Sequence, residues 1–146
     1  MIRPATPGDA VAVARINRAA RAEAMPWLPD LHTPEEDVAW FRGTLAGEGW
    51  IYEVDGDPVG YALWKDGELH DLYVDPAAQR RGVGSALFAR VQEAHPDGFR
   101  FWAFRDNWRA RQFYEERGCV VVAATDDGNE EKLPDVQYEW LPTAPA

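Results

Sequence analysis

The stretch Gln79-Arg80-Arg81-Gly82-Val83-Gly84-Ser85 carries the strongest signal for the fold, because it joins a predicted strand to a predicted helix. It follows the apolar run Leu72-Tyr73-Val74 and opens a segment whose apolar residues recur at helical spacing. Glycines at a helix start let unpaired backbone N–H groups come close to an anion, and the helix dipole adds positive charge there. Arg80 and Arg81 add cationic side chains. The stretch therefore predicts either a phosphate-binding turn or a plain strand-to-helix turn with two solvated arginines.

Two common phosphate-binding motifs are excluded because the residues that they require are absent. A P-loop needs a lysine before the serine or threonine, but Gly84 is followed directly by Ser85 and then by Ala86. A Rossmann fingerprint needs a third small residue three positions after Gly84, and that position is Leu87.

Hydrophobic patterns on both sides of this turn predict a mixed α/β fold. We expect strands at Ile2 and at 50–54, 59–64, 68–74, 99–104, 119–124 and 136–141, and helices that begin after Thr6-Pro7, after Thr33-Pro34, at Val83 and at Trp108. The strands at 68–74 and 99–104 are joined through a helix, so they should run parallel.

Length and composition predict one compact domain over residues 1–146. The chain has 146 residues, of which 46% are hydrophobic and 27% charged, which is ordinary for a globular domain of this size. Its apolar runs are only a few residues long, so we expect no membrane span. The Pro/Ala-rich residues 142–146 should form a frayed tail.

Charge and cysteine content limit the partners. The chain has 15 Lys and Arg against 25 Asp and Glu, a net charge of −10, which argues against nucleic-acid binding and favours cationic small molecules or peptides. The single cysteine, Cys119, excludes an intramolecular disulfide and fits a reducing compartment such as the cytoplasm. We interpret Cys119 as a small buried apolar residue with no catalytic part, and we expect no metal.

The pattern Gln-x-x-Gly-x-Gly after a strand resembles the GNAT superfamily of acyl-CoA-dependent N-acetyltransferases. Residues 2–9 resemble the opening strand and helix start of that family, and residues 107–118 resemble its second cofactor segment. The three segments occur in the family's order and span nearly the whole chain. The resemblance implies a mixed sheet of about seven strands with about four helices, in which the fourth and fifth strands are parallel and splayed apart.

The resemblance also implies acetyl-CoA as co-substrate and assigns the residues that would bind it. Backbone N–H groups from Arg80 to Ser85 would hold the pyrophosphate, Leu72 and Val74 would pair with the pantetheine arm, and Asn107 would hydrogen-bond it. Asn107 could instead be a helix cap, or could do both. The implied set is Leu72, Val74, Gln79, Arg80, Arg81, Gly82, Val83, Gly84, Ser85, Asn107 and Ala110.

Acetyl transfer to an amine needs a base, because an alkylamine with a pKa near ~10 is mostly protonated at neutral pH. Regular strand alternation would place Glu68 and His70 on one face with Leu72 and Val74. Many family members carry a catalytic glutamate where Glu68 stands, while arylalkylamine acetyltransferases have histidines at positions resembling 68 and 70. We therefore rank Glu68 first and His70 second. The alternatives are a solvated glutamate and a core histidine.

The departing thiolate needs a proton, and Tyr114 stands where the family carries a tyrosine near the thioester sulfur. Core packing is the alternative for this side chain. The amine acceptor would be cationic, because aromatic and acidic residues gather in the segments that line the family's acceptor site. These residues are Met25, Trp27, His32, Trp40, Phe41, Asp126, Asp127, Glu130, Glu131 and Asp135, although for most of them we favour a role in the core or in a solvated loop.

Three hypotheses follow for the function. The first is an N-acetyltransferase that moves the acetyl group of acetyl-CoA to a primary amine of a small molecule or peptide by direct attack in a ternary complex. The second is an acyl-CoA-binding regulatory module without turnover, and the third is a phosphate-ligand binding protein unrelated to coenzyme A. The joint presence of Asn107, Tyr114 and Glu68 favours the transferase over the module. We expect a monomer or a homodimer.

Overall fold

The computed structural model describes residues 1–143 and contains the predicted order of strands and helices. Residues 144–146, the last part of the predicted frayed tail, lie outside the described residues. The elements are β1 (Ile2–Pro4), η1 (Pro7–Asp9), α1 (Ala10–Ala24), α2 (Pro34–Thr44), β2 (Gly49–Val54), β3 (Asp57–Lys65), β4 (Glu68–Val74), η2 (Pro76–Ala78), α3 (Val83–Ala94), β5 (Phe99–Phe104), α4 (Trp108–Glu116), β6 (Val120–Thr125) and β7 (Asp135–Trp140).

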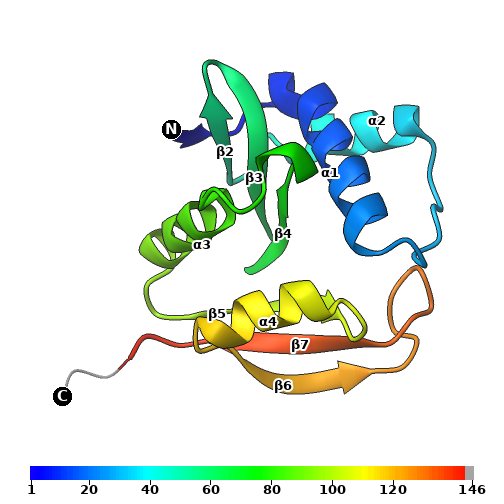
Figure 1. Ribbon diagram of the computed structural model, residues 1–146, viewed down its shortest axis with the longest axis vertical. Helices are drawn as coiled ribbons and strands as arrows, with labels where there is room; N and C mark the ends of the chain where they lie inside the picture. The colour runs from blue at the N-terminus through cyan, green and yellow to red at the C-terminus, as the bar shows by residue number, and fades with distance from the viewer. Residues whose placement is uncertain (144–146) are drawn as a thin grey trace.

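The strands form one seven-stranded sheet in the order β1-β2-β3-β4-β5-β7-β6. Neighbouring strands are antiparallel except β4 and β5, which are parallel because α3 connects them. The predicted mixed sheet and its parallel central pair are therefore confirmed. Figure 1 shows β2, β3 and β4 in one half of the molecule with α1, α2 and α3, and β5, β7 and β6 in the other half with α4.

The two central strands separate after a single point of contact. Within residues 1–143, Leu69 and Phe101 are the only residues paired between β4 and β5. Beyond Leu69, β4 continues towards Val74 without a partner on that side, as the diverging ribbons in Figure 1 show. The predicted splay is confirmed, and it leaves backbone groups of β4 available in the middle of the sheet.

A β-bulge at His70 interrupts β4. Leu63 of β3 faces Asp71 while the next residue, Trp64, faces Leu69, so His70 is the extra residue. Side chains therefore do not alternate regularly across this position. The predicted sharing of a face by His70, Leu72 and Val74 is wrong, because the bulge turns His70 towards the same side as Asp71.

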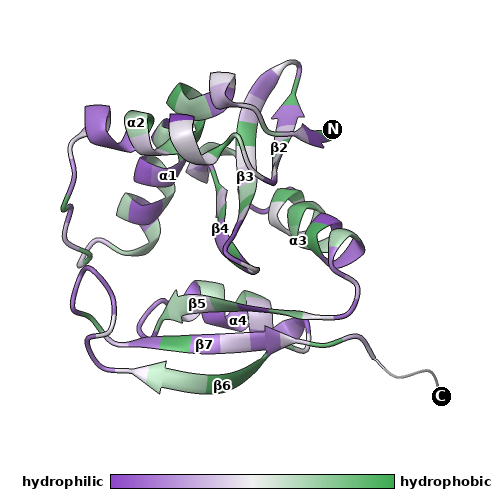
Figure 2. Ribbon diagram, turned by 180° about the vertical axis from the view of Figure 1, so that it is seen from behind, coloured by the Kyte–Doolittle hydropathy of each residue, from purple (hydrophilic) through white to green (hydrophobic). Residues whose placement is uncertain are grey.

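Two hydrophobic clusters cover the two faces of the sheet. One contains Leu69, Leu87, Phe88 and residues of β5, β7 and α4, and the other joins α1 and α2 to the middle of β2 and β3. Figure 2 shows hydrophobic colour on α3 and along β3. Gly60 permits α3 to lie this close, since a Cβ there would be 2.8 Å from the Val83 side chain.

Local signals in the sequence explain where the helices begin. Thr33 caps α2 by accepting a hydrogen bond from the Glu36 N–H, and the Glu36 carboxylate accepts one from the Thr33 N–H. Gly82 precedes α3 with φ at +79°, a conformation that favours glycine. No helix within residues 1–143 is long and apolar enough to cross a bilayer.

Candidate functional site

Two cavities meet where β4 and β5 separate. The first, of about 580 Å³, is enclosed by α1, α2, β4, β5 and the loop between β6 and β7, and we refer to it as the α1–α2 cavity. The second, of about 620 Å³, lies between β4, the turn at Gln79–Ser85 and α4, and we refer to it as the α3–α4 cavity. The residues that line both cavities are Leu72, Tyr73, Asn107, Ala110 and Tyr114.

The turn that precedes α3 forms one wall of the α3–α4 cavity. Arg80 and Gly82 have φ angles of +65° and +79°, which bend the backbone sharply before the helix. Because α3 begins at Val83, its first N–H groups have no partner in the helix and carry the positive end of its dipole. Every predicted cofactor-binding residue except Arg81 lines this cavity.

Two further arginines reach the same cavity from the segment around α4. The Arg117 guanidinium lies 3.5 Å from the centroid of the Phe113 ring and donates a hydrogen bond to the Ser85 hydroxyl. Arg109 forms an ion pair of 2.9 Å with Glu23. Our sequence reasoning missed both residues, although they belong to a segment that it assigned to the cofactor. The cavity therefore combines several guanidinium groups with a helix N-terminus, which suits an anionic ligand.

Asn107 caps α4 and also points a donor at the cavities. Its Oδ1 accepts a hydrogen bond of 3.3 Å from the Ala110 N–H. The residue is only 8% exposed, and no hydrogen bond of its Nδ2 is found to any residue within 1–143. Since no buried side-chain polar atom of the described residues lacks a partner, the Nδ2 group must reach open space. The predicted cap is confirmed, and the side chain keeps a donor for a ligand.

The ring of Tyr114 packs against other aromatic rings, whereas its hydroxyl faces the two cavities. The ring centroid lies 4.4 Å from that of Phe101 and 5.8 Å from that of Phe88, and the residue is 8% exposed. No residue within 1–143 hydrogen-bonds the hydroxyl, so by the same reasoning as for Asn107 it faces the cavities. Burial raises the pKa of Tyr114 well above its usual range, so the phenol keeps its proton.

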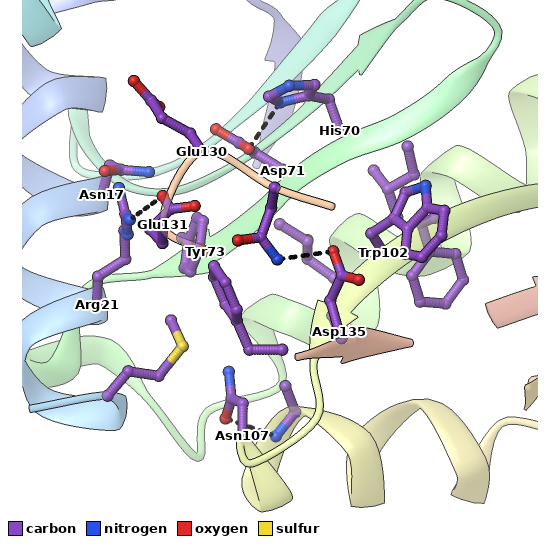
Figure 3. A pocket seen from close by; sticks show the side chains of 18 of the residues that line it. Asn17, Arg21, His70, Asp71, Tyr73, Trp102, Asn107, Glu130, Glu131 and Asp135 are labelled. Carbon is purple, nitrogen blue, oxygen red and sulfur yellow. Dashed lines mark hydrogen bonds and ion pairs between the residues drawn. The ribbon is translucent and has the colours of Figure 1, made fainter. Parts of the chain in front are cut away.

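His70 and Asp71 form a pair on the wall of the α1–α2 cavity, as Figure 3 shows. Nδ1 of His70 lies 2.9 Å from Oδ1 of Asp71, and the Trp40 ring covers the imidazole at a centroid distance of 5.4 Å. The hydrogen bond to Asp71 raises the pKa of His70, an effect that burial opposes in part. A histidine with one nitrogen fixed by a carboxylate can use the other for proton transfer.

Glu68 lies outside both cavities. It lines neither of them, whereas His70 lines the α1–α2 cavity. Burial raises the pKa of Glu68, a shift that the neighbouring His70 opposes. Sequence reasoning missed Asp71 and Tyr73, which both line the α1–α2 cavity. The available signal for Asp71 was a carboxylate between apolar residues of a strand, Leu69 and Leu72, because such a group needs a partner when it is buried.

The opposite wall of the α1–α2 cavity comes from the β6–β7 loop. Glu131 forms an ion pair of 3.3 Å with Arg21, as Figure 3 shows. Glu130 lies 2.6 Å from Nε2 of His32, so the loop contacts both α1 and the segment before α2. Trp27, Asp126 and Asp127 do not line the cavity, whereas the other residues predicted for the acceptor do. The lining residues that we did not predict include Asn17, Arg21, Glu36, Asp37, Trp102 and Phe104.

Neither a metal site nor a reactive thiol is visible in the part of the chain that the structure describes. Residues 1–143 contain no group of three or more His, Cys, Asp and Glu side chains placed to hold a metal ion. Cys119 is 3% exposed, and burial raises the pKa of its thiol to about 12. A thiol with this pKa is not a nucleophile at neutral pH.

The model of the acetyltransferase (GNAT) family matches residues 15–119 of the chain. The chain belongs to the GNAT family. It is 34% identical over 95 residues to peptidyl-lysine N-acetyltransferase YiaC of Escherichia coli strain K12, an alignment that covers 64% of this chain and 63% of that relative. This GNAT chain spans 63% or less of the length of three curated relatives that it matches.

Solved structures agree with this assignment. A GCN5-related N-acetyltransferase from Rhodopseudomonas palustris has a TM-score of 0.81 and 26% sequence identity, with 97% of this chain and 94% of that chain covered. The structure of yncA from Salmonella typhimurium with its cofactor acetyl-CoA has a TM-score of 0.71 at 20% identity, with 100% and 95% covered. The GNAT fold therefore extends over nearly the whole chain.

Proposed function

We propose that residues 1–146 form one N-acetyltransferase domain that moves an acetyl group from acetyl-CoA to a primary amine of a small molecule or peptide. The observation that supports this proposal is the junction of two cavities at Leu72, Tyr73, Asn107, Ala110 and Tyr114. One cavity suits an anionic ligand and the other contains a proton acceptor. Two substrates could thus meet at their shared wall, as direct attack in a ternary complex requires.

Acetyl-CoA would occupy the α3–α4 cavity. Its pyrophosphate would accept hydrogen bonds from the backbone at 80–85, with Arg80 and Arg117 close to the phosphates. Its pantetheine arm would pair with the backbone of Leu72 and Val74 where β4 has no partner, and Nδ2 of Asn107 would donate a hydrogen bond to it. The fold neighbour with acetyl-CoA supports this assignment.

The amine would enter from the α1–α2 cavity and attack the thioester carbonyl carbon. Nε2 of His70 would take the amine proton, the carbon–sulfur bond would break, and the Tyr114 hydroxyl would protonate the leaving thiolate. The products are then an amide and the thiol of coenzyme A. We place His70 before Glu68 as the base, because His70 lines the cavity. Glu68 stays the second candidate, since burial raises its pKa towards a range that is useful for a base.

The acceptor would be a cation. Carboxylates outnumber the cationic side chains on the wall of the α1–α2 cavity, where Glu36, Asp37, Glu130, Glu131 and Asp135 gather. Trp40 and Phe41 supply apolar surface beside them, so an ammonium group on an apolar body suits the cavity. The lone buried cysteine of this chain fits a reducing compartment such as the cytoplasm.

Binding and turnover test the proposal separately. Acetyl-CoA at ~100 times its Kd should stabilise the folded chain by about 2.7 kcal/mol, which a thermal unfolding experiment would detect. Absence of a shift would contradict both the transferase and the acyl-CoA-binding module. Release of coenzyme A thiol with a panel of cationic amines distinguishes these two functions, since the module binds acetyl-CoA but releases no thiol.

A further inference from the structure

We propose that Asp71 is a positioning residue that holds His70 in the tautomer with a proton on Nδ1 and a free lone pair on Nε2. The buried side chains of Tyr61 and Asn17 fix Asp71 in turn. This inference rests on the proposed function, because it concerns the base of that reaction. It adds positioning residues that the predicted set of catalytic residues does not contain.

The bulge in β4 makes the His70–Asp71 contact possible. In a regular strand, consecutive side chains point to opposite faces and do not meet. The extra residue in β4 lies at His70, between the pairs Trp64–Leu69 and Leu63–Asp71. It brings Nδ1 of His70 to 2.9 Å from Oδ1 of its immediate neighbour Asp71. Bulges often redirect a side chain in this way beside an active site.

The hydrogen bonds behind Asp71 have only one consistent direction. Nδ2 of Asn17 donates to the Tyr61 hydroxyl over 2.9 Å, so the Tyr61 oxygen is the acceptor in that bond. The Tyr61 hydroxyl has a single proton, and it donates this proton to Oδ2 of Asp71 over 2.8 Å. A carboxylate accepts hydrogen bonds and donates none. Nδ1 of His70 must therefore carry the proton that it shares with Oδ1 of Asp71.

The supporting side chains are rigidly held. Tyr61 is fully buried, and Asn17 is 7% exposed within α1. The Tyr61 ring packs against Phe41 at a centroid distance of 5.8 Å. Burial raises the pKa of Tyr61 far above its usual range, so the hydroxyl stays a donor. A chain of three side chains thus runs from α1 through β3 to β4 and ends at the imidazole.

Several charged groups act on His70 at once. Asp71 raises the pKa of His70 by its hydrogen bond and by its charge, Glu68 raises it by charge, and Lys65 lowers it. From α2 the uncharged Trp40 ring covers the imidazole. Loss of the Asp71 carboxylate should therefore lower the pKa of His70, because burial and Lys65 then act with less opposition.

Nitrogen NMR on the wild-type chain tests the tautomer without any measurement of turnover. Long-range ¹⁵N–¹H spectra distinguish the two neutral tautomers, and a His70→Gln variant assigns the His70 signals among the three histidines. We expect neutral His70 to carry its proton on Nδ1. A proton on Nε2 would overturn the inference, whether or not the chain proves to be an acetyltransferase.

Asp71→Asn tests the effect on the base, with Asp9→Asn as the matched control on a carboxylate outside the site. Asp71→Asn should move the NMR titration midpoint of His70 to lower pH and reduce its preference for the Nδ1–H tautomer. It should also lower kcat/KM for the amine by about tenfold or more, which is part of the ~10²- to 10⁴-fold that a general base supplies, at unchanged KM for acetyl-CoA. Asp9→Asn should leave all of these values unchanged. An unchanged His70 titration in Asp71→Asn would overturn the positioning role.

Tyr61→Phe tests the hydrogen bond from Tyr61 to Asp71, with Tyr52→Phe as its control on the same sheet. We expect Tyr61→Phe to weaken the tautomer preference and to lower kcat/KM for the amine, since Asp71 then loses the donor that orients it. Tyr52→Phe should change neither. Equal behaviour of the two folded variants in the tautomer spectra would remove Tyr61 from the chain of positioning residues. Absence of turnover together with the expected NMR result would instead count against the proposed function alone.

Discussion

Replacement of Tyr114 by phenylalanine removes one hydroxyl group from the shared wall of the two cavities. The aromatic ring would keep its contacts with Phe101 and Phe88, at centroid distances of 4.4 Å and 5.8 Å. No residue within 1–143 hydrogen-bonds the hydroxyl, so the variant loses no bond between described residues. The free energy of unfolding should therefore change by no more than about 0.5 kcal/mol.

The effect on catalysis should be far larger. A positioned general acid contributes roughly 10²- to 10⁴-fold to a rate, which corresponds to about 2.7–5.4 kcal/mol of activation free energy. We expect kcat of Tyr114→Phe to fall within this range. The Kd for acetyl-CoA should stay nearly constant, because the hydroxyl acts on the thiolate that forms only when the carbon–sulfur bond breaks.

Tyr138→Phe provides a control with the opposite pattern. The Tyr138 hydroxyl accepts a hydrogen bond of 2.9 Å from Arg111 and donates one to Glu115, and Tyr138 lines neither cavity. Its loss should lower the free energy of unfolding by about 1 kcal/mol and leave kcat unchanged. Thiol release and thermal unfolding of both variants measure the two quantities. Wild-type kcat in Tyr114→Phe would refute the role of Tyr114 as an acid.

Three further substitutions test the fold, its acid stability and the cofactor site. Gly60→Ala should lower the free energy of unfolding by about 1–3 kcal/mol in urea titrations, because the new Cβ would lie 2.8 Å from Val83; unchanged stability would contradict the packing of α3 on β3. The hydrogen bond from Arg3 lowers the pKa of Asp9 in the folded chain, so this stabilisation is present above the unfolded pKa and is lost as pH falls through the folded pKa. Asp9→Asn should therefore reduce stability at neutral pH and flatten its decline below about pH 4, and an equally steep decline would count against the pair. Asn107→Ala should remove a helix cap worth about 1 kcal/mol and also weaken acetyl-CoA binding in calorimetry, whereas a loss of stability alone would leave Asn107 a cap and nothing more.

The sequence was sufficient to predict the order of elements and the turn before α3, because both depend on local rules. Glycine at position 82 permits a φ of +79° at the residue that directly precedes α3. Consecutive residues of that turn were less predictable. Arg80, with φ at +65°, lines the α3–α4 cavity, and Arg81 does not.

The bulge at His70 lay beyond prediction from the sequence. It depends on how β4 pairs with β3, and one extra residue reverses the side to which the following side chains point. Strand alternation consequently placed His70 on the wrong face and concealed its contact with Asp71. The attachment of Glu131 to Arg21 was equally hidden, because 110 residues separate them and only the folded sheet brings them together.

Calorimetric titration with acetyl-CoA tests the central claim most directly, with Ala110→Trp as the comparison. Ala110 lines both cavities, so a tryptophan there would fill the space in which the acetyl group should lie. We predict one acetyl-CoA bound per wild-type chain, and severe loss of binding in a folded Ala110→Trp variant. Absence of binding to the wild-type chain, or equal affinity in the two proteins, would contradict the assignment of the cofactor to the opening between β4 and β5.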